Sequence, residues 1–206
     1  MNRLTKIALS VVLLLTAVLL SACGGSGLSE DEIRDTYRDL VEASYPLNDV
    51  YYGDGLPFVE DEKAVSTLLG LAQGTDLSVN YMPVAKESPL QTEDEIREAT
   101  AAVFSPDMCE MLYEIGFTGV STDDEARVAF ARYIQQDGFL TVRIDLADSA
   151  MNVSRTYDFD QMTLIADESD RICASFPSYM EGEKSVDVKI TLVKTADGWR
   201  LDSPTY

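Results

Sequence analysis

The chain has 206 residues, and its 36 acidic residues outnumber 16 basic ones to give a formal net charge of −20. Such a surface repels the phosphates of DNA and RNA, so we exclude nucleic acid as a partner. The sequence contains no histidine, which excludes Ser-His-Asp and Cys-His catalysis and the usual zinc sites. The hydrophobic share of 46% is ordinary and predicts a folded core.

The first residues have the pattern of an export signal. Arg3 and Lys6 precede an uncharged apolar run, Ile7–Leu20. As a helix this run would extend only about 21 Å, whereas the hydrocarbon core of a membrane is roughly 30 Å thick. Its length therefore favours a cleaved leader over a permanent membrane span. The run ends in Leu20-Ser21-Ala22-Cys23.

This ending resembles the lipobox of bacterial lipoproteins. The resemblance implies that a leader of residues 1–22 is cleaved after Ala22 and that the thiol of Cys23 receives a diacylglycerol. It also implies a cell-membrane location, with the protein lipid-anchored on the extracytoplasmic face. Residues 23–28 are rich in glycine and predict a flexible tether. The alternative is an ordinary exported protein in which the cysteine is incidental.

Residues 29–206 are expected to fold as a single domain that begins with a helix. Ser29-Glu30-Asp31-Glu32 is a capping box, in which the serine oxygen accepts a backbone N–H and the glutamate returns the interaction. Apolar residues then recur at helical spacing from Ile33 onward. The pattern predicts a helix over 30–44, which Pro46 either bends or ends.

The next segment, YYGDGLPF, places three aromatic rings around two glycines. Two interpretations of Tyr51, Tyr52 and Phe58 are open. The rings form an exposed binding patch, because tyrosine offers apolar area with a polar tip. Alternatively, they fill the open end of a sheet and belong to the core.

Two more helix starts follow in the middle of the chain. Thr92-Glu93-Asp94-Glu95 is a second capping box, and Ser105-Pro106 places a cap before a first-turn proline. The apolar face behind them continues to Gly116. Before these helices, the sequence predicts a short helix over 64–71 and an extended segment over 76–83.

The pattern then changes to alternation with a period of two. Asp137-Gly138 separates the run Val128–Ile134 from the run Phe139–Leu146, which predicts a β-hairpin. Further strands are predicted over 156–166, 171–179 and 185–194, the last with one buried face. Asp197-Gly198 then turns the chain into a final strand over 199–201.

Helices followed by antiparallel strands predict an α+β fold, with N-terminal helices packed on a curved antiparallel β-meander. This order of elements resembles the cystatin-like and NTF2-like architectures. The segments ARYIQQDGFLTVRI, DGWRLDSPTY and TEDEIREATAAVFSPDMCEMLYE resemble small lipoproteins of Gram-positive bacteria. On these segments, the mature chain resembles cystatin-like inhibitors of cell-wall DL-endopeptidases. This resemblance implies a non-enzymatic envelope protein, and no inhibitory residue can be carried over from it.

Three functions follow as hypotheses. The first is a non-enzymatic binding module that modulates a cell-wall hydrolase. The second is a small-molecule-binding or catalytic pocket within the concave sheet, and the third is a spacer without a specific ligand. We identify no catalytic residue, no metal ligand and no cofactor site. Cys109 and Cys173 form either a disulfide or two small buried thiols, and the sequence leaves both options open.

Overall fold

The computed structural model describes residues 25–59, 81–119, 131–136, 138–144 and 153–206. The lipobox, the predicted helix over 64–71 and the first residues of the predicted hairpin lie outside this range.

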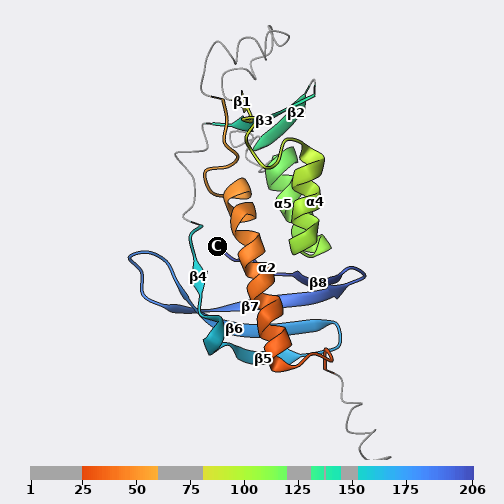
Figure 1. The fold of residues 1–206 in the computed structure, drawn as a ribbon, viewed down its shortest axis with the longest axis vertical. Coiled ribbons are helices and arrows are strands. Elements are labelled where there is room, and N and C mark those ends of the chain that lie inside the picture. The colour runs from red at the N-terminus through yellow and green to blue at the C-terminus, as the bar shows by residue number, and fades with distance from the viewer. Residues whose placement is uncertain (1–24, 60–80, 120–130, 137, 145–152) are drawn as a thin grey trace, which may run out of the picture.

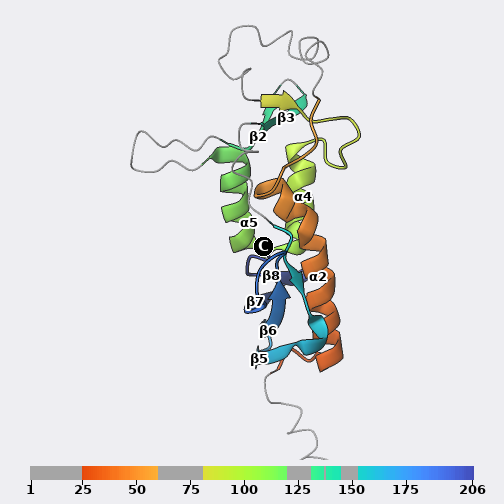
Figure 2. The ribbon, with the colours of Figure 1, turned by 90° about the vertical axis from the view of Figure 1, so that its left-hand side faces the viewer.

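Within the described residues, helices pack on a curled antiparallel sheet, which confirms the α+β class (Figure 1). The long helix α2 (Glu30–Tyr51) lies across one face of a five-stranded sheet. Two shorter helices, α4 (Glu93–Val103) and α5 (Pro106–Tyr113), stand beside the C-terminal half of α2. A π-helical turn over Glu114–Thr118 continues α5. Figure 2 shows α5 on one side of the molecule and α2 on the other, at the end where α2 finishes.

The strands form two sheets, whereas the sequence predicts one meander. The larger sheet contains β4 (Thr156–Tyr157), β5 (Thr163–Asp167), β6 (Arg171–Tyr179), β7 (Val186–Thr195) and β8 (Gly198–Leu201). Its order is β4-β6-β7-β8, and β5 also pairs with β6. The smaller sheet has the order β1-β3-β2, from β1 (Tyr81–Pro83), β2 (Tyr133–Gln136) and β3 (Phe139–Arg143).

The prediction of one strand over 156–166 is wrong. A 3₁₀ turn, Phe159–Gln161, separates β4 from β5. The carboxylate of Asp158 accepts hydrogen bonds from the backbone N–H of Asp160 at 3.2 Å and from the side chain of Gln161. Such local side-chain bonds compete with a strand ladder, so the chain turns here. The prediction for β7 is correct in extent, but its buried face is limited to Ile190 and Leu192 because Val186 is 47% exposed.

Helix α2 continues to Tyr51 through Pro46, seven residues beyond the predicted end at residue 44. A proline inside a helix removes one hydrogen-bond donor and disfavours the helix. Leu47, Val50 and Tyr51 are each buried, and their packing compensates for that loss. The helix therefore has 22 residues and a length of about 33 Å.

Aromatic rings fill the space between α2 and the inner face of the larger sheet. Tyr37 is fully buried, and its ring meets Phe176 of β6 edge-on at 4.9 Å between centroids. The rings of Tyr157 and Phe159 pack around the same phenylalanine. The hydroxyl of Tyr37 donates to two carbonyls, those of Ile172 and Ile190, each at 3.0 Å. This contact fixes α2 over the two central strands.

One hydrophobic core runs through both sheets. Its buried members include Tyr133, Leu140 and Val142 from the smaller sheet and Ile172, Phe176 and Ile190 from the larger sheet. The C-terminus is tied to the same core, because the buried hydroxyl of Thr205 lies 2.6 Å from that of Ser44 and accepts from Asn48 at 2.9 Å.

Residues at the start of the described chain contact the domain. The backbone N–H of Ser26 donates to the carboxylate of Asp167 on β5 at 2.8 Å. Leu28 is partly buried against the core.

The predicted hairpin is confirmed by the antiparallel pairing of β2 with β3, in which Gln136 faces Phe139. Gly138 lies in its turn with a φ of +86°, and a Cβ added there would meet no atom within 4 Å. Any penalty for substitution at this position thus comes from the backbone conformation and not from a steric clash.

Replacement Gly138→Val is expected to lower the free energy of unfolding by about 1–3 kcal/mol, because a β-branched residue is strained at positive φ. Gly138→Asn is the matched control and should lower it less, since asparagine tolerates this region. Urea denaturation measures both. An unchanged midpoint for Gly138→Val would contradict the turn conformation.

Candidate functional site

A surface cleft of about 360 Å³ lies where α4 and α5 meet the turn between β7 and β8. Its lining includes Phe104, Cys109, Glu110 and Tyr113 from the helical side and Asp197 and Arg200 from the strand side. The volume is at the low end of the range for small-molecule sites. The cleft is lined by apolar side chains together with charged side chains of both signs.

The corner between α4 and α5 is fixed to β8, and this contact forms one wall of the cleft. Phe104 pairs with Leu201 in an isolated bridge, and the backbone N–H of Ser105 donates to the Leu201 carbonyl at 2.8 Å. The Ser105 hydroxyl donates to Asp202 at 2.6 Å and accepts from the backbone N–H of Met108 at 3.2 Å. Ser105 therefore caps α5, as the Ser-Pro pair predicts, and also joins it to the sheet.

Arg200 connects the two walls. Its Nε donates to the carbonyl of Ala101 at 2.9 Å, and its Nη1 donates to the carbonyl of Trp199 at 2.9 Å. Ala101 lies in the last turn of α4, where the sequence Thr100-Ala101-Ala102-Val103 supplies no basic residue. A cation at this helix end is favourable because the helix dipole is negative there. Arg200 thus stabilises α4 while lining the cleft.

The thiol of Cys109 is poorly suited to nucleophilic chemistry. Cys109 is only 5% exposed, and its thiol donates to the carbonyl of Phe104 at 3.6 Å. Burial raises the pKa of the Cys109 thiol, which outweighs the opposite effects of Tyr113 and Arg200. Because the thiolate is the reactive form, a raised pKa keeps this cysteine unreactive at neutral pH.

Of the two options for the cysteines, the structure contains free thiols. Cys109 is buried on α5, and Cys173 is half-buried on β6. Neighbouring residues on β6 alternate between buried and half-buried, which places Cys173 away from the side chains that face α2.

The three aromatic residues considered as a binding patch do not form one surface. Tyr51 is 2% exposed, and its hydroxyl lies 2.9 Å from that of Thr100. Tyr52 is half-buried with its ring 4.2 Å from the ring of Tyr206. Phe58 is half-buried against the core. The interpretation as core rings therefore applies to Tyr51, and none of the three lines the cleft.

The inner face of the larger sheet is occupied by α2 and its aromatic cluster, so the cleft lies outside the concave face. This arrangement places Tyr37, Phe176, Tyr157 and Phe159 where the sequence hypothesis expects a pocket.

Sequence reasoning missed the role of Arg132, which is 5% exposed. Its guanidinium donates to the carbonyls of Tyr51 and Gly53 at the C-terminal end of α2. Gly55, at a φ of +83°, leaves room for it, since a Cβ there would lie 3.0 Å from Nη2. The sequence does contain one signal for this contact. The last turn of α2 has no basic residue of its own, so a cation from elsewhere in the chain is expected at this negative helix end.

Among the described residues, no group of three or more His, Cys, Asp or Glu side chains is placed to hold a metal ion. The same residues include no helix that is both long and apolar enough to span a membrane. No protein-family model matches the chain, and no curated protein matches it.

The exposure of the two thiols predicts a difference in reactivity. In the native protein, iodoacetamide should modify Cys173 faster than Cys109, because Cys109 is buried and its pKa is raised. In urea the two rates should become similar. Peptide mass spectrometry of timed samples measures each site, and faster native labelling of Cys109 would contradict the description of the cleft.

Proposed function

We propose that the protein is a lipid-anchored binding module on the extracytoplasmic face of the cell membrane, attached through Cys23. The observation that carries the proposal is the position of the N-terminal segment. The described chain begins beside β5, and α2 leads from there toward α4, α5 and the smaller sheet (Figure 1). An anchor at Cys23 would hold the β5 end near the membrane and present the cleft farther from it.

The cleft chemistry favours recognition over catalysis. Its thiol has a raised pKa, and the guanidinium of Arg200 is engaged with two backbone carbonyls. The hydroxyl of Tyr113 donates to the carbonyl of Arg97 at 2.8 Å. Groups held in this way provide a shaped surface with fixed charges, which suits a binding partner.

We propose a cell-wall hydrolase with a basic surface as the partner. The chain carries a net charge of −20, and opposite charge accelerates association. The finer architecture that we propose is cystatin-like or NTF2-like, since a single long helix crosses a curled antiparallel sheet. This architecture agrees with the resemblance to cystatin-like hydrolase inhibitors.

Replacement Cys23→Ser tests the anchor. Serine lacks the thiol that forms the thioether, so the variant should incorporate no labelled fatty acid and should be released or remain uncleaved. Cys173→Ser is the matched control and should be labelled like the wild type. Equal labelling of Cys23→Ser and wild type would contradict the anchor.

Charge reversal at the cleft tests the partner. Glu110 and Asp197 line the cleft, whereas Glu183 is exposed in the turn between β6 and β7. The double variant Glu110→Lys/Asp197→Lys should weaken binding to a purified DL-endopeptidase by roughly tenfold or more, because like charges at an interface are repulsive. Glu183→Lys should change it little. Binding that is absent in the wild type, or equal in all three proteins, would contradict this partner assignment.

A further inference from the structure

The contact between the N-terminal segment and β5 restricts where a lipid anchor can lie. Ser26 is held by Asp167 of β5 at 2.8 Å, and a Cβ on Gly25 would come within 2.8 Å of the same carboxylate. Cys23 lies three positions before Ser26, and a fully extended chain spans at most about 3.6 Å per residue. Cys23, the residue that would carry the lipid, is therefore within about 11 Å of Ser26.

β5 is the strand at this end of the molecule, and apolar side chains are exposed on it. Leu164 is 38% exposed and Ile165 is 49% exposed. Among the described strands, β5 pairs with β6 alone. The register shifts between Leu164 and Ala166, so Ile165 is the extra residue of a bulge. Figure 1 shows β5 as the lowest strand of the sheet, at the end where the described chain begins.

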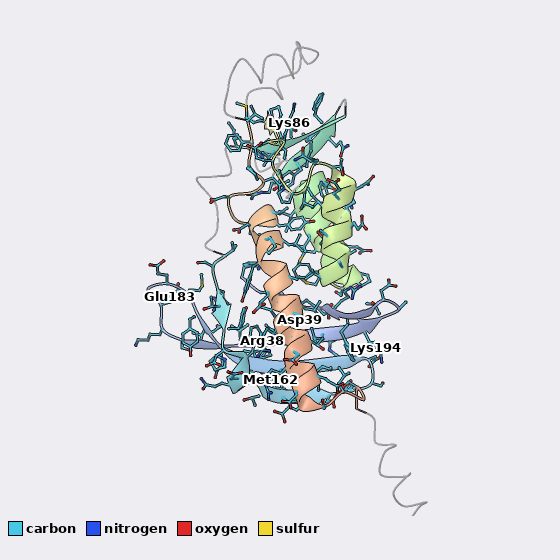
Figure 3. All side chains as sticks on the ribbon, viewed as in Figure 1. Arg38, Asp39, Lys86, Met162, Glu183 and Lys194 are labelled. Atoms are coloured by element: carbon cyan, nitrogen blue, oxygen red, sulfur yellow. The ribbon has the colours of Figure 1, made fainter. Side chains whose placement is uncertain are left out.

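The opposite end of the molecule provides a comparison. Phe139 on β3 is 40% exposed, which is similar to the exposure of Leu164 and Ile165. The smaller sheet that contains Phe139 lies at the far end of α2 (Figure 1). In Figure 3, Met162, which directly precedes β5, lies at the lower end, and Lys86 lies at the upper end. Phe139 is therefore about as exposed as Leu164 and Ile165, but it lies much farther from the proposed anchor.

We propose that Leu164 and Ile165 form a membrane-contact surface, which rests against the lipid bilayer that carries the Cys23 anchor. This inference depends on the lipid anchor of the proposed function. The short link to Ser26 keeps the two side chains at a high effective concentration near the bilayer, so a small apolar contact is sufficient.

The charges around β5 define the kind of contact. Asp167 and Glu168 lie at the end of β5, and Asp160 lies on the preceding turn. Asp160 is paired with Arg38 at 3.6 Å, whereas the carboxylates of Asp167 and Glu168 repel anionic headgroups, so the contact is apolar and needs the anchor to form. The same negative charges disfavour a second copy of the chain at this edge, because pairing would bring like charges together.

The test uses the full lipidated protein in phosphatidylcholine vesicles whose acyl chains carry bromine, which quenches nearby tryptophan. Trp199 is the sole tryptophan and is replaced by phenylalanine in both test proteins. The first then carries Ile165→Trp, and the matched control carries Phe139→Trp. Urea midpoints establish that each variant is folded, and Leu164→Trp replaces the first if Ile165→Trp does not fold.

The Ile165→Trp protein should lose most of its emission in brominated vesicles relative to unbrominated ones, and the Phe139→Trp protein should keep its emission. Equal emission of Ile165→Trp in the two vesicle types, with diacylglycerol on Cys23 shown by intact mass, would overturn the membrane contact alone. Absence of that lipid by mass would overturn the anchor and the contact together. A blue shift without quenching that increases with protein density would identify a second copy as the occupant and overturn the lipid assignment.

Discussion

The hydroxyl of Tyr37 is shared between the carbonyls of Ile172 and Ile190, one on each central strand of the larger sheet. Tyr37 is fully buried, so water cannot replace this hydrogen bond. Displacement of α2 along the sheet would leave the buried Tyr37 hydroxyl without a partner, which typically costs about 1–3 kcal/mol. The position of α2 is therefore fixed by a polar contact inside an aromatic cluster.

The other end of α2 is fixed by contacts from two different segments. The hydroxyl of Tyr133 donates to the carbonyl of Val50 at 2.8 Å and accepts from the backbone N–H of Leu56 at 3.1 Å. Arg132 donates to the carbonyl of Tyr51 at the helix end and to that of Gly53 just beyond it, and Tyr51 meets Thr100 of α4. The same helix thus joins the larger sheet to the smaller sheet and to the helical wall of the cleft. In the function that we propose, α2 determines how far the cleft lies from the membrane.

Local signals explain the parts of the fold that the sequence predicts well. Ser29, Thr92 and Ser105 each cap the helix that they are expected to begin, because a cap depends on residues within one turn. The strand β6 covers the predicted residues 171–179, and β8 begins one residue before the predicted strand over 199–201. These features need no knowledge of distant residues.

Distant contacts explain the parts that the sequence does not predict. Ser26 meets Asp167 across 141 positions of the chain, and Arg132 meets Tyr51 across 81 positions. The cleft has the same origin, because Arg200 reaches Ala101 only when β8 lies against α4. Glycine-rich composition predicts a flexible tether over 23–28, and it gives no sign of the hydrogen bond between Ser26 and Asp167.

Amide hydrogen exchange at increasing urea concentrations tests most directly whether α2 joins the two ends into one rigid unit. The account predicts that amides in β3 and in β6 exchange through the same opening, with equal free energies and equal dependence on urea. Exchange of β3 at a clearly lower free energy, while β6 remains protected, would contradict it. In that case the end that we propose to be anchored would not determine the position of the cleft.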